Sequence, residues 1–284
     1  MILRICQQTN ESARLTCKVL GFPRSSFFAA GTETARQASD RQLGTLIEEI
    51  FRTHQSRYGY RRIAAELADH GLRCAPERVR RLMKGRKLHA IQPKRYTPKT
   101  SDGKAPNPAP NRLKDKPLPT APNTVWTGDI TYIPTASGWR YLAVVIDLFS
   151  RRIIGWELAD HMRADLVVTA LSKALKTRCP EKTLIFHSDR GSQYGSGAYR
   201  KILTQAGIRQ SMSAKANPYD NAWTESFIGT LKLELVQKQR YADDTIARRK
   251  IFEYIDAYYN TRRKHSALGY LSPSQFEAST LTLN

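Results

Sequence analysis

The chain has 284 residues and a formal net charge of +21, which indicates a polyanionic partner, because lysines and arginines that displace condensed counterions bind nucleic acid. No apolar run reaches the length of a membrane-spanning helix and the start lacks a signal peptide's apolar core, so we expect a cytoplasmic protein, nucleoid-associated when bound to DNA. The 4 cysteines form no Cys-x-x-Cys pair, which argues against a structural zinc site.

The first 91 residues predict two small helical units. Residues 1–40 read as a helix-turn-helix-like segment, in which a helix from about residue 10 is broken at Gly21 and a second begins near Pro23. Residues 41–91 predict a basic helix-turn-helix domain, where Gly71 closes one helix and Pro76 opens the next. Residues 51–100 carry 14 Lys and Arg against 3 Asp and Glu, so this part of the chain is expected to bind DNA.

The helix after Pro76 has an apolar stripe of Val79, Leu82 and Met83, with cations on its other faces. This pattern is typical of a recognition helix flanked by phosphate contacts, and the alternative is a basic, solvated helix with no docking role. The candidate DNA-binding residues of this region are Arg61, Arg62, Arg78, Arg80, Arg81, Lys84, Arg86 and Lys87.

Residues 92–123 are rich in proline and lysine and predict an extended linker. Residues 124–237 then predict an α/β catalytic core. Its order is three antiparallel strands, helix, strand, helix, strand and helix, with the strands at 126–133, 141–149, 152–158, 183–187 and 208–212. This is the order of a ribonuclease-H-like domain. Residues 238–284 predict a helical tail packed on the core, with DNA or protomer contact by Arg262, Arg263 and Lys264 as the alternative.

Three acidic residues occur in apolar or glycine-rich surroundings. Asp129 lies in a strand on the same face as Thr127 and Thr131, and Asp189 follows an apolar strand at the end where sites form in open sheets. Each aspartate alone could equally cap a turn. The third acid, Glu225, follows Asp189 after 35 intervening residues, and the three together predict a carboxylate site for two divalent metal ions.

Helix geometry supports Glu225. We predict a helix from Asn221 to about Gln237 with a buried stripe of Trp223, Phe227 and Leu231, and Glu225 lies about 160–200° from Trp223 and Phe227. Lys232 returns to within about 20° of Glu225, so one face offers a metal ligand and a phosphate-binding cation. The alternative is a solvent-facing Glu and Lys.

Four further polar residues receive supporting or structural roles. We expect Asp147 to anchor a hairpin or to pair with Arg151 or Arg152. His187 is expected to shape the strand of Asp189, or to be a satisfied structural histidine. Asn217 and Asn221 are expected to support the site, because the segment from Asn217 caps the Glu225 helix through Asp220 or Asn221.

Three strings in the chain are distinctive: His-Ser-Asp-Arg-Gly-Ser-Gln-Tyr, Asn-Pro-Tyr-Asp-Asn-Ala-Trp-Thr-Glu-Ser-Phe and Tyr-Tyr-Asn-Thr-Arg-Arg-Lys-His-Ser-Ala-Leu-Gly-Tyr-Leu-Ser-Pro. They resemble those of the DDE transposases of the insertion sequence 3 family, which are relatives of retroviral integrases. The resemblance implies an integrase core with a five-stranded mixed sheet, preceded by the all-helical segments. It also implies a second-frame product, usually fused to an upstream-frame protein.

The resemblance further implies cutting and joining of DNA at element ends. Two Mg²⁺ or Mn²⁺ ions would be held by Asp129, Asp189 and Glu225, and Lys232 would orient phosphate. Partners would be the terminal inverted repeats and target DNA, bound by a dimer or higher oligomer. Two other functions stay open: a ribonuclease-H-type nuclease that cleaves without joining, and a DNA-binding regulator with an inactive core.

Overall fold

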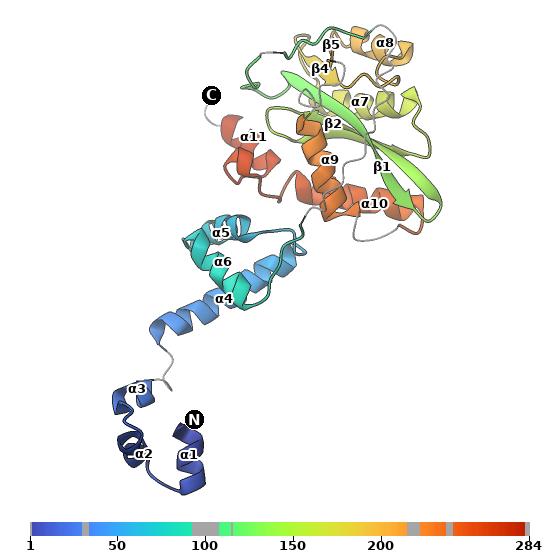
Figure 1. Cartoon of the computed structure of the whole chain (residues 1–284). Helices are drawn as coiled ribbons and strands as arrows, with labels where there is room; N and C mark the ends of the chain where they lie inside the picture. The colour runs from blue at the N-terminus through green and yellow to red at the C-terminus, as the bar shows by residue number, and fades with distance from the viewer. Residues whose placement is uncertain are drawn as a thin grey trace. The chain divides into compact units, whose positions relative to one another are not determined.

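The computed structural model describes residues 2–29, 34–92, 108–114, 116–214, 222–236 and 241–281. The chain divides into two compact units, residues 1–90 and residues 91–284 (Figure 1). Most of the predicted linker, together with Asn217 and Asn221, lies outside the described residues.

The first unit begins with three short helices, α1 (Ile2–Thr9), α2 (Ala13–Val19) and α3 (Arg24–Ala29). The Ser12 hydroxyl caps α2 by accepting the N–H of Leu15. Gly21 has a φ of +60°, which suits glycine and ends the helix at the predicted break. Helices α2 and α3 were expected from the sequence, whereas α1 was not.

Helices α4 (Ala35–Thr53), α5 (Tyr60–Asp69) and α6 (Pro76–Gly85) form the rest of this unit. A capping box between Thr34 and Gln37 starts α4, so the boundary predicted at residue 40 falls inside a helix and is corrected. The predicted stripe of α6 is buried, and it packs with apolar residues of α4 and α5 in one small core: Ile47, Ile63, Leu67, Val79, Leu82 and Met83.

The second unit is built on a five-stranded mixed sheet in the order β3-β2-β1-β4-β5. Strands β1, β2 and β3 pair antiparallel, whereas β4 pairs parallel with β1 and β5 pairs parallel with β4. The fold class predicted from the element order is therefore confirmed. The strands are β1 (Val125–Thr135), β2 (Gly138–Asp147), β3 (Ile153–Ala159), β4 (Ile185–Ser188) and β5 (Arg209–Met212).

Helices cover both faces of the sheet (Figure 1). One face packs against α7 (Ala164–Arg178) and α8 (Gly197–Gln205), in a core that includes Trp126, Leu171 and Phe186. Gly155 permits this packing, because a Cβ there would lie 2.4 Å from the backbone oxygen of Ala170. Successive residues of a strand point to opposite faces, so Thr127 faces the other side, where α9 (Ala222–Glu234) lies against β1.

The chain ends in α10 (Asp244–Tyr254), a π-helical turn η3 (Ile255–Tyr259), a 3-10 turn η4 (Ser266–Leu268) and α11 (Pro273–Leu281). Arg263 and Lys264 are only 4% and 3% exposed, so these two cations pack inside the unit and cannot contact DNA in this arrangement. Arg262 is exposed.

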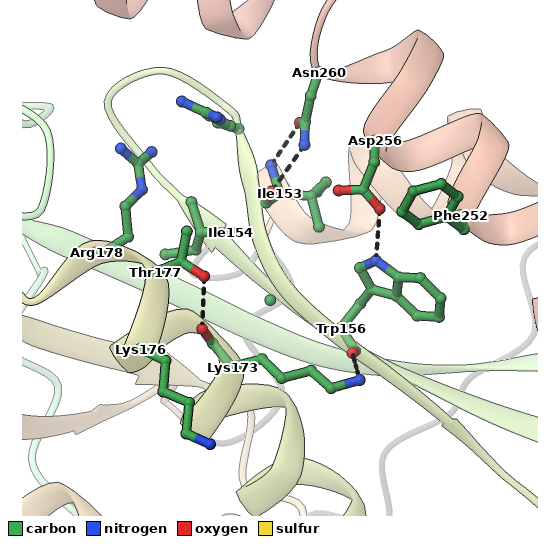
Figure 2. Close-up of a pocket in the computed structure, with 12 residues that line it drawn as sticks. Ile153, Ile154, Trp156, Lys173, Lys176, Thr177, Arg178, Phe252, Asp256 and Asn260 are labelled. Carbon is green, nitrogen blue, oxygen red and sulfur yellow. Dashed lines mark hydrogen bonds between the residues drawn. The ribbon is translucent and has the colours of Figure 1, made fainter.

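Side chains cover the outer edge of β3. The Asn260 amide both donates to the carbonyl oxygen of Ile153 and accepts its N–H, and Lys173 donates to the carbonyl oxygen of Trp156 (Figure 2). Arg248 donates to the carbonyl oxygen of Leu158. A cavity of about 550 Å³ lies here between β3, α7 and the C-terminal helices, and its lining contains none of the three predicted metal ligands.

Candidate active site

Asp129 lies in the middle of the central strand β1. Its Oδ1 accepts the N–H of Ile130 at 2.7 Å, which orients the carboxylate. The preceding Gly128 leaves no room for a side chain, because a Cβ there would meet the Phe186 ring at 2.7 Å and the Tyr194 hydroxyl at 3.3 Å. This part of β1 is therefore closely packed on one face and carries the acid on the other.

Asp189 follows the last residue of β4. The parallel register places Gly128 beside Ser188, so Asp129 and Asp189 are neighbours across adjacent strands. The Oδ1 of Asp189 accepts the N–H of Gly191 at 2.9 Å. The predicted position at the carboxyl end of a strand is thus where the structure places this acid.

Glu225 is in the first turn of α9 and its side chain is exposed. The predicted buried stripe needs one correction: Thr224 is fully buried, whereas Trp223 is only partly buried. The i, i+3, i+4 and i+7 spacing of the buried side chains gives the reason, and a hydroxyl can occupy such a stripe when it has a partner. The stripe consists of Thr224, Phe227, Ile228 and Leu231.

The three carboxylates act on one another electrostatically. Burial, and then the charges of Asp189 and Glu225, raise the pKa of Asp129 to about 8, against a lowering by the Ile130 hydrogen bond and by Lys232. Burial and then Asp189 raise the pKa of Glu225. Burial lowers the pKa of Lys232, although the charge of Asp129 acts in the opposite direction. All four predicted groups are therefore close enough to interact.

These side chains do not converge on one point. Within the described residues, no three His, Cys, Asp or Glu side chains come close enough together to form a ready metal cage. The donor set nevertheless suits a hard cation, because it consists of carboxylate oxygens, the pKa values of Asp129 and Glu225 are raised by burial and by neighbouring acids, and one lysine is nearby. A cation would relieve this repulsion.

His187 is buried beneath the site in a polar network. Its Nδ1 lies 2.8 Å from the Ser211 hydroxyl and its Nε2 lies 3.2 Å from the Ser213 hydroxyl. The Ser213 hydroxyl also donates to the carbonyl oxygen of Ser188, next to Asp189. Both ring nitrogens of His187 thus lie within hydrogen-bond distance of serine hydroxyls, and its predicted supporting role stays a prediction. Asp147 is likewise buried and accepts the N–H groups of Asn123 and Phe149, which anchors the β2–β3 hairpin.

Most of the predicted DNA-binding arginines of the first unit make contacts within it. Arg78 and Arg81 of α6 both pair with Asp40 of α4, each at 2.6 Å. Arg80 pairs with Glu77 on the same helix. Arg86 donates to the carbonyl oxygen of Arg41, and Arg61 and Arg62 lie over tyrosine rings. Lys84 and Lys87 are exposed, with no ion pair among the described residues.

Two sets of residues that fix the two ends of α9 were not predicted. The Thr224 hydroxyl donates to the Thr127 hydroxyl at 2.8 Å, which joins α9 to β1. At the other end of α9, buried Glu234 accepts hydrogen bonds from Arg263 and from the Tyr254 hydroxyl. The sequence signal for Thr224 was its place in the apolar stripe, whereas nothing in the spacing linked Glu234 to Arg263.

Comparisons with known proteins agree with this architecture. The sequence matches the family described as "Integrase core domain" over residues 119–218 and again over residues 206–273, and the "HTH-like domain" family over residues 38–96. A simian T-cell lymphotropic virus intasome structure aligns with a TM-score of 0.48 at 16% identity, covering 75% of this chain and 70% of that chain.

None of the helices in the described segments is long and apolar enough to cross a membrane.

Two curated relatives are similar over most of their length. The transposase for insertion sequence element IS904 from Lactococcus lactis is 43% identical over 245 residues, covering 86% of this chain and 96% of the relative. Transposase InsF for insertion sequence IS3A from Escherichia coli is 36% identical over 278 residues, with 96% of both chains covered. With an integrase core, a preceding HTH-like domain and these relatives, the chain belongs to the transposases of the insertion sequence 3 family.

Proposed function

We propose that this transposase cleaves and joins DNA strands at the ends of its element, with two Mg²⁺ or Mn²⁺ ions held by Asp129, Asp189 and Glu225. The observation that carries the proposal is the grouping of three mutually interacting carboxylates from β1, the end of β4 and α9. When bound, two such ions would activate the attacking oxygen and stabilise the leaving oxygen of a phosphodiester.

The protein's own residues would orient the DNA at this site. Asp129 interacts electrostatically with both other acids and lies on the central strand β1, which suits a ligand shared by both ions. Lys232 lies on α9 two turns beyond Glu225, and Gly229 between them leaves the helix surface open, because a Cβ there would meet nothing within 4 Å. A phosphate could therefore approach this face, with Lys232 as a point charge.

The test is a cleavage and joining assay on paired element ends in Mg²⁺, with and without an upstream-frame partner. Asp129→Asn, Asp189→Asn and Glu225→Gln should each abolish both nicked and joined products. Glu181→Gln, which alters an exposed acid outside the site, is the control and should retain both. Full activity in any of the three site variants would refute the assignment, and nicking without joining by the wild type would indicate a nuclease.

A further inference from the structure

The three carboxylates differ in how they are held. Asp129 and Asp189 each accept a backbone N–H from a residue one or two positions further along the chain. Among the described residues no hydrogen bond to the Glu225 carboxylate occurs, and this side chain is exposed. Local backbone contacts therefore orient the aspartates, whereas the position of Glu225 depends on how α9 is fixed to the sheet.

A buried hydroxyl pair fixes α9 beside this residue. The Thr224 Oγ1 donates to the Thr127 Oγ1 at 2.8 Å, and the two residues are 0% and 2% exposed. Thr224 immediately precedes Glu225 on α9. Thr127 is two residues before Asp129 on β1, so both point to the same face of the strand. One hydrogen bond thus connects the neighbours of two predicted metal ligands.

Apolar packing alone fixes the rotation and position of α9 on the sheet less precisely than this hydrogen bond does. Trp223 packs against a small cluster of Val125, Leu148 and Ile185, and such contacts tolerate sliding because they have no preferred direction. A hydrogen bond is directional. A rotation of α9 by one residue, about 100°, would break the threonine pair and carry Glu225 away from Asp129.

We propose that Thr127 and Thr224 are positioning residues, whose hydroxyl pair sets the rotation and depth of α9 and so holds Glu225 within reach of the metal site. The inference rests on the proposed function of the three acids. It assigns the two threonines no contact with DNA or metal.

Thr131 offers a matched control on the same strand. It lies four residues after Thr127, on the same face, and is also buried. Its hydroxyl has no hydrogen-bond partner among the described residues. Replacement of threonine by valine preserves shape at both positions, but only at Thr127 does it remove a hydrogen bond.

The experiment measures Mn²⁺ binding to the full chain by electron paramagnetic resonance, alongside kcat and KM for cleavage of element ends. Thr224→Val and Thr127→Val should weaken Mn²⁺ binding about 10–100-fold, the range found when outer partners of metal ligands are lost. They should lower kcat and leave the KM for DNA unchanged. Thr224→Ser should behave as the wild type because it keeps the hydroxyl, and Thr131→Val should match the wild type throughout.

Binding is expressed per folded molecule, with the folded fraction measured by circular dichroism. The double variant Thr127→Val/Thr224→Val leaves neither hydroxyl unpaired, so it should fold well and still bind Mn²⁺ weakly. Wild-type Mn²⁺ affinity in folded Thr224→Val or in the double variant would overturn the positioning role. Wild-type affinity in Glu225→Gln would instead overturn the proposed function.

Discussion

Two local clusters of charged side chains, one around α6 in the helical unit and one at the proposed active site, carry opposite charge imbalances. Around α6, one acid serves two cations, since Asp40 pairs with both Arg78 and Arg81. At the proposed active site Asp129 interacts with two other acids, Asp189 and Glu225, and with one lysine, Lys232, whose pKa is lowered by burial. The local excess is therefore cationic around α6 and anionic at the proposed active site.

This difference in local charge indicates how each cluster would bind a charged partner. The cations of α6 and their acids are on the surface, where the ion pairs are weak and can exchange for phosphate. At the proposed active site Asp129 is withdrawn from water, so burial and then the charges of Asp189 and Glu225 raise its pKa. Surface pairs favour reversible DNA binding, whereas a buried acid with acidic neighbours favours a coordinated cation.

The largest expected effect tests the contrast between buried and exposed ion pairs. Arg263→Ala should lower the free energy of unfolding by about 3–5 kcal/mol, because it removes the cation that pairs with the buried carboxylate of Glu234. Urea unfolding measures the change. The control is Arg262→Ala, at an exposed neighbour, which should change stability by less than about 0.5 kcal/mol. Equal effects in both variants would show that the buried pair of Arg263 contributes no more to stability than the exposed side chain of Arg262.

The second prediction concerns the acids without metal. The folded-state pKa of Asp129 is raised to about 8 from its ordinary 3.8, so its contribution to stability is full below about pH 4 and is lost as the pH rises through about 8. In EDTA, the free energy of unfolding of Asp129→Asn should therefore exceed that of the wild type by a few kcal/mol at pH 8. Near pH 4 the two free energies should be equal. Urea titrations across this range measure the crossover, and Mg²⁺ should close the gap by stabilising the wild type only. A gap that does not depend on pH would contradict the repulsion argument.

A third prediction asks whether Asp40 restrains the basic helix. Asp40→Asn should free Arg78 and Arg81 for phosphate and tighten DNA binding, with the slope of log affinity against log salt steeper by about 1–2. Fluorescence anisotropy at several salt concentrations gives the slope. Glu48→Gln is the matched control, because its pair with Arg52 lies within α4 and does not involve α6. Weaker binding by Asp40→Asn would show that the acid orients the arginines instead.

The smallest expected effect separates paired from unpaired cations on α6. Lys84 has no ion pair among the described residues, so Lys84→Ala should reduce the salt slope by about 1 and weaken binding equally on all sequences. Arg80→Ala, which first gives up its pair with Glu77, should weaken binding less. The same anisotropy titrations compare the two variants. A larger loss in Arg80→Ala would mean that its pair opens at no cost.

Where the fold could be predicted, local pattern and tertiary packing agree. The strands of the sheet follow alternation and turn residues, so the element order of the catalytic core was predicted correctly, and the helix at Pro76 follows its apolar stripe. The helix α1 was missed because the eight residues Ile2–Thr9 have no acidic first turn and no strong capping signal. The start of α4 was misplaced because its capping box, Thr34 and Gln37, lies before the apolar residues that define the helix.

The three acids could be proposed from the sequence because they lie in distinctive strings, and their role in metal binding stays a prediction. The residue pairs that hold α9 in place could not be proposed from the sequence, because each pair joins residues that are distant in the chain. Thr127 and Thr224 are 97 residues apart, and Glu234 and Arg263 are 29 apart, so no spacing rule links either pair. Local sequence indicates what a residue can do, and tertiary contacts decide which residue holds it in place.

The covering of β3 has a consequence for solubility. An edge strand with free N–H and C=O groups is a template on which other chains can add a strand and aggregate. Asn260 occupies both backbone groups of Ile153, and Lys173 and Arg248 occupy the next carbonyl oxygens. Arg248 lies on α10 and Asn260 directly follows η3, so two of these three side chains come from the C-terminal tail, and the tail protects the edge of the sheet from pairing with another strand. A catalytic core cut off before α10 would keep its carboxylates and lose this protection.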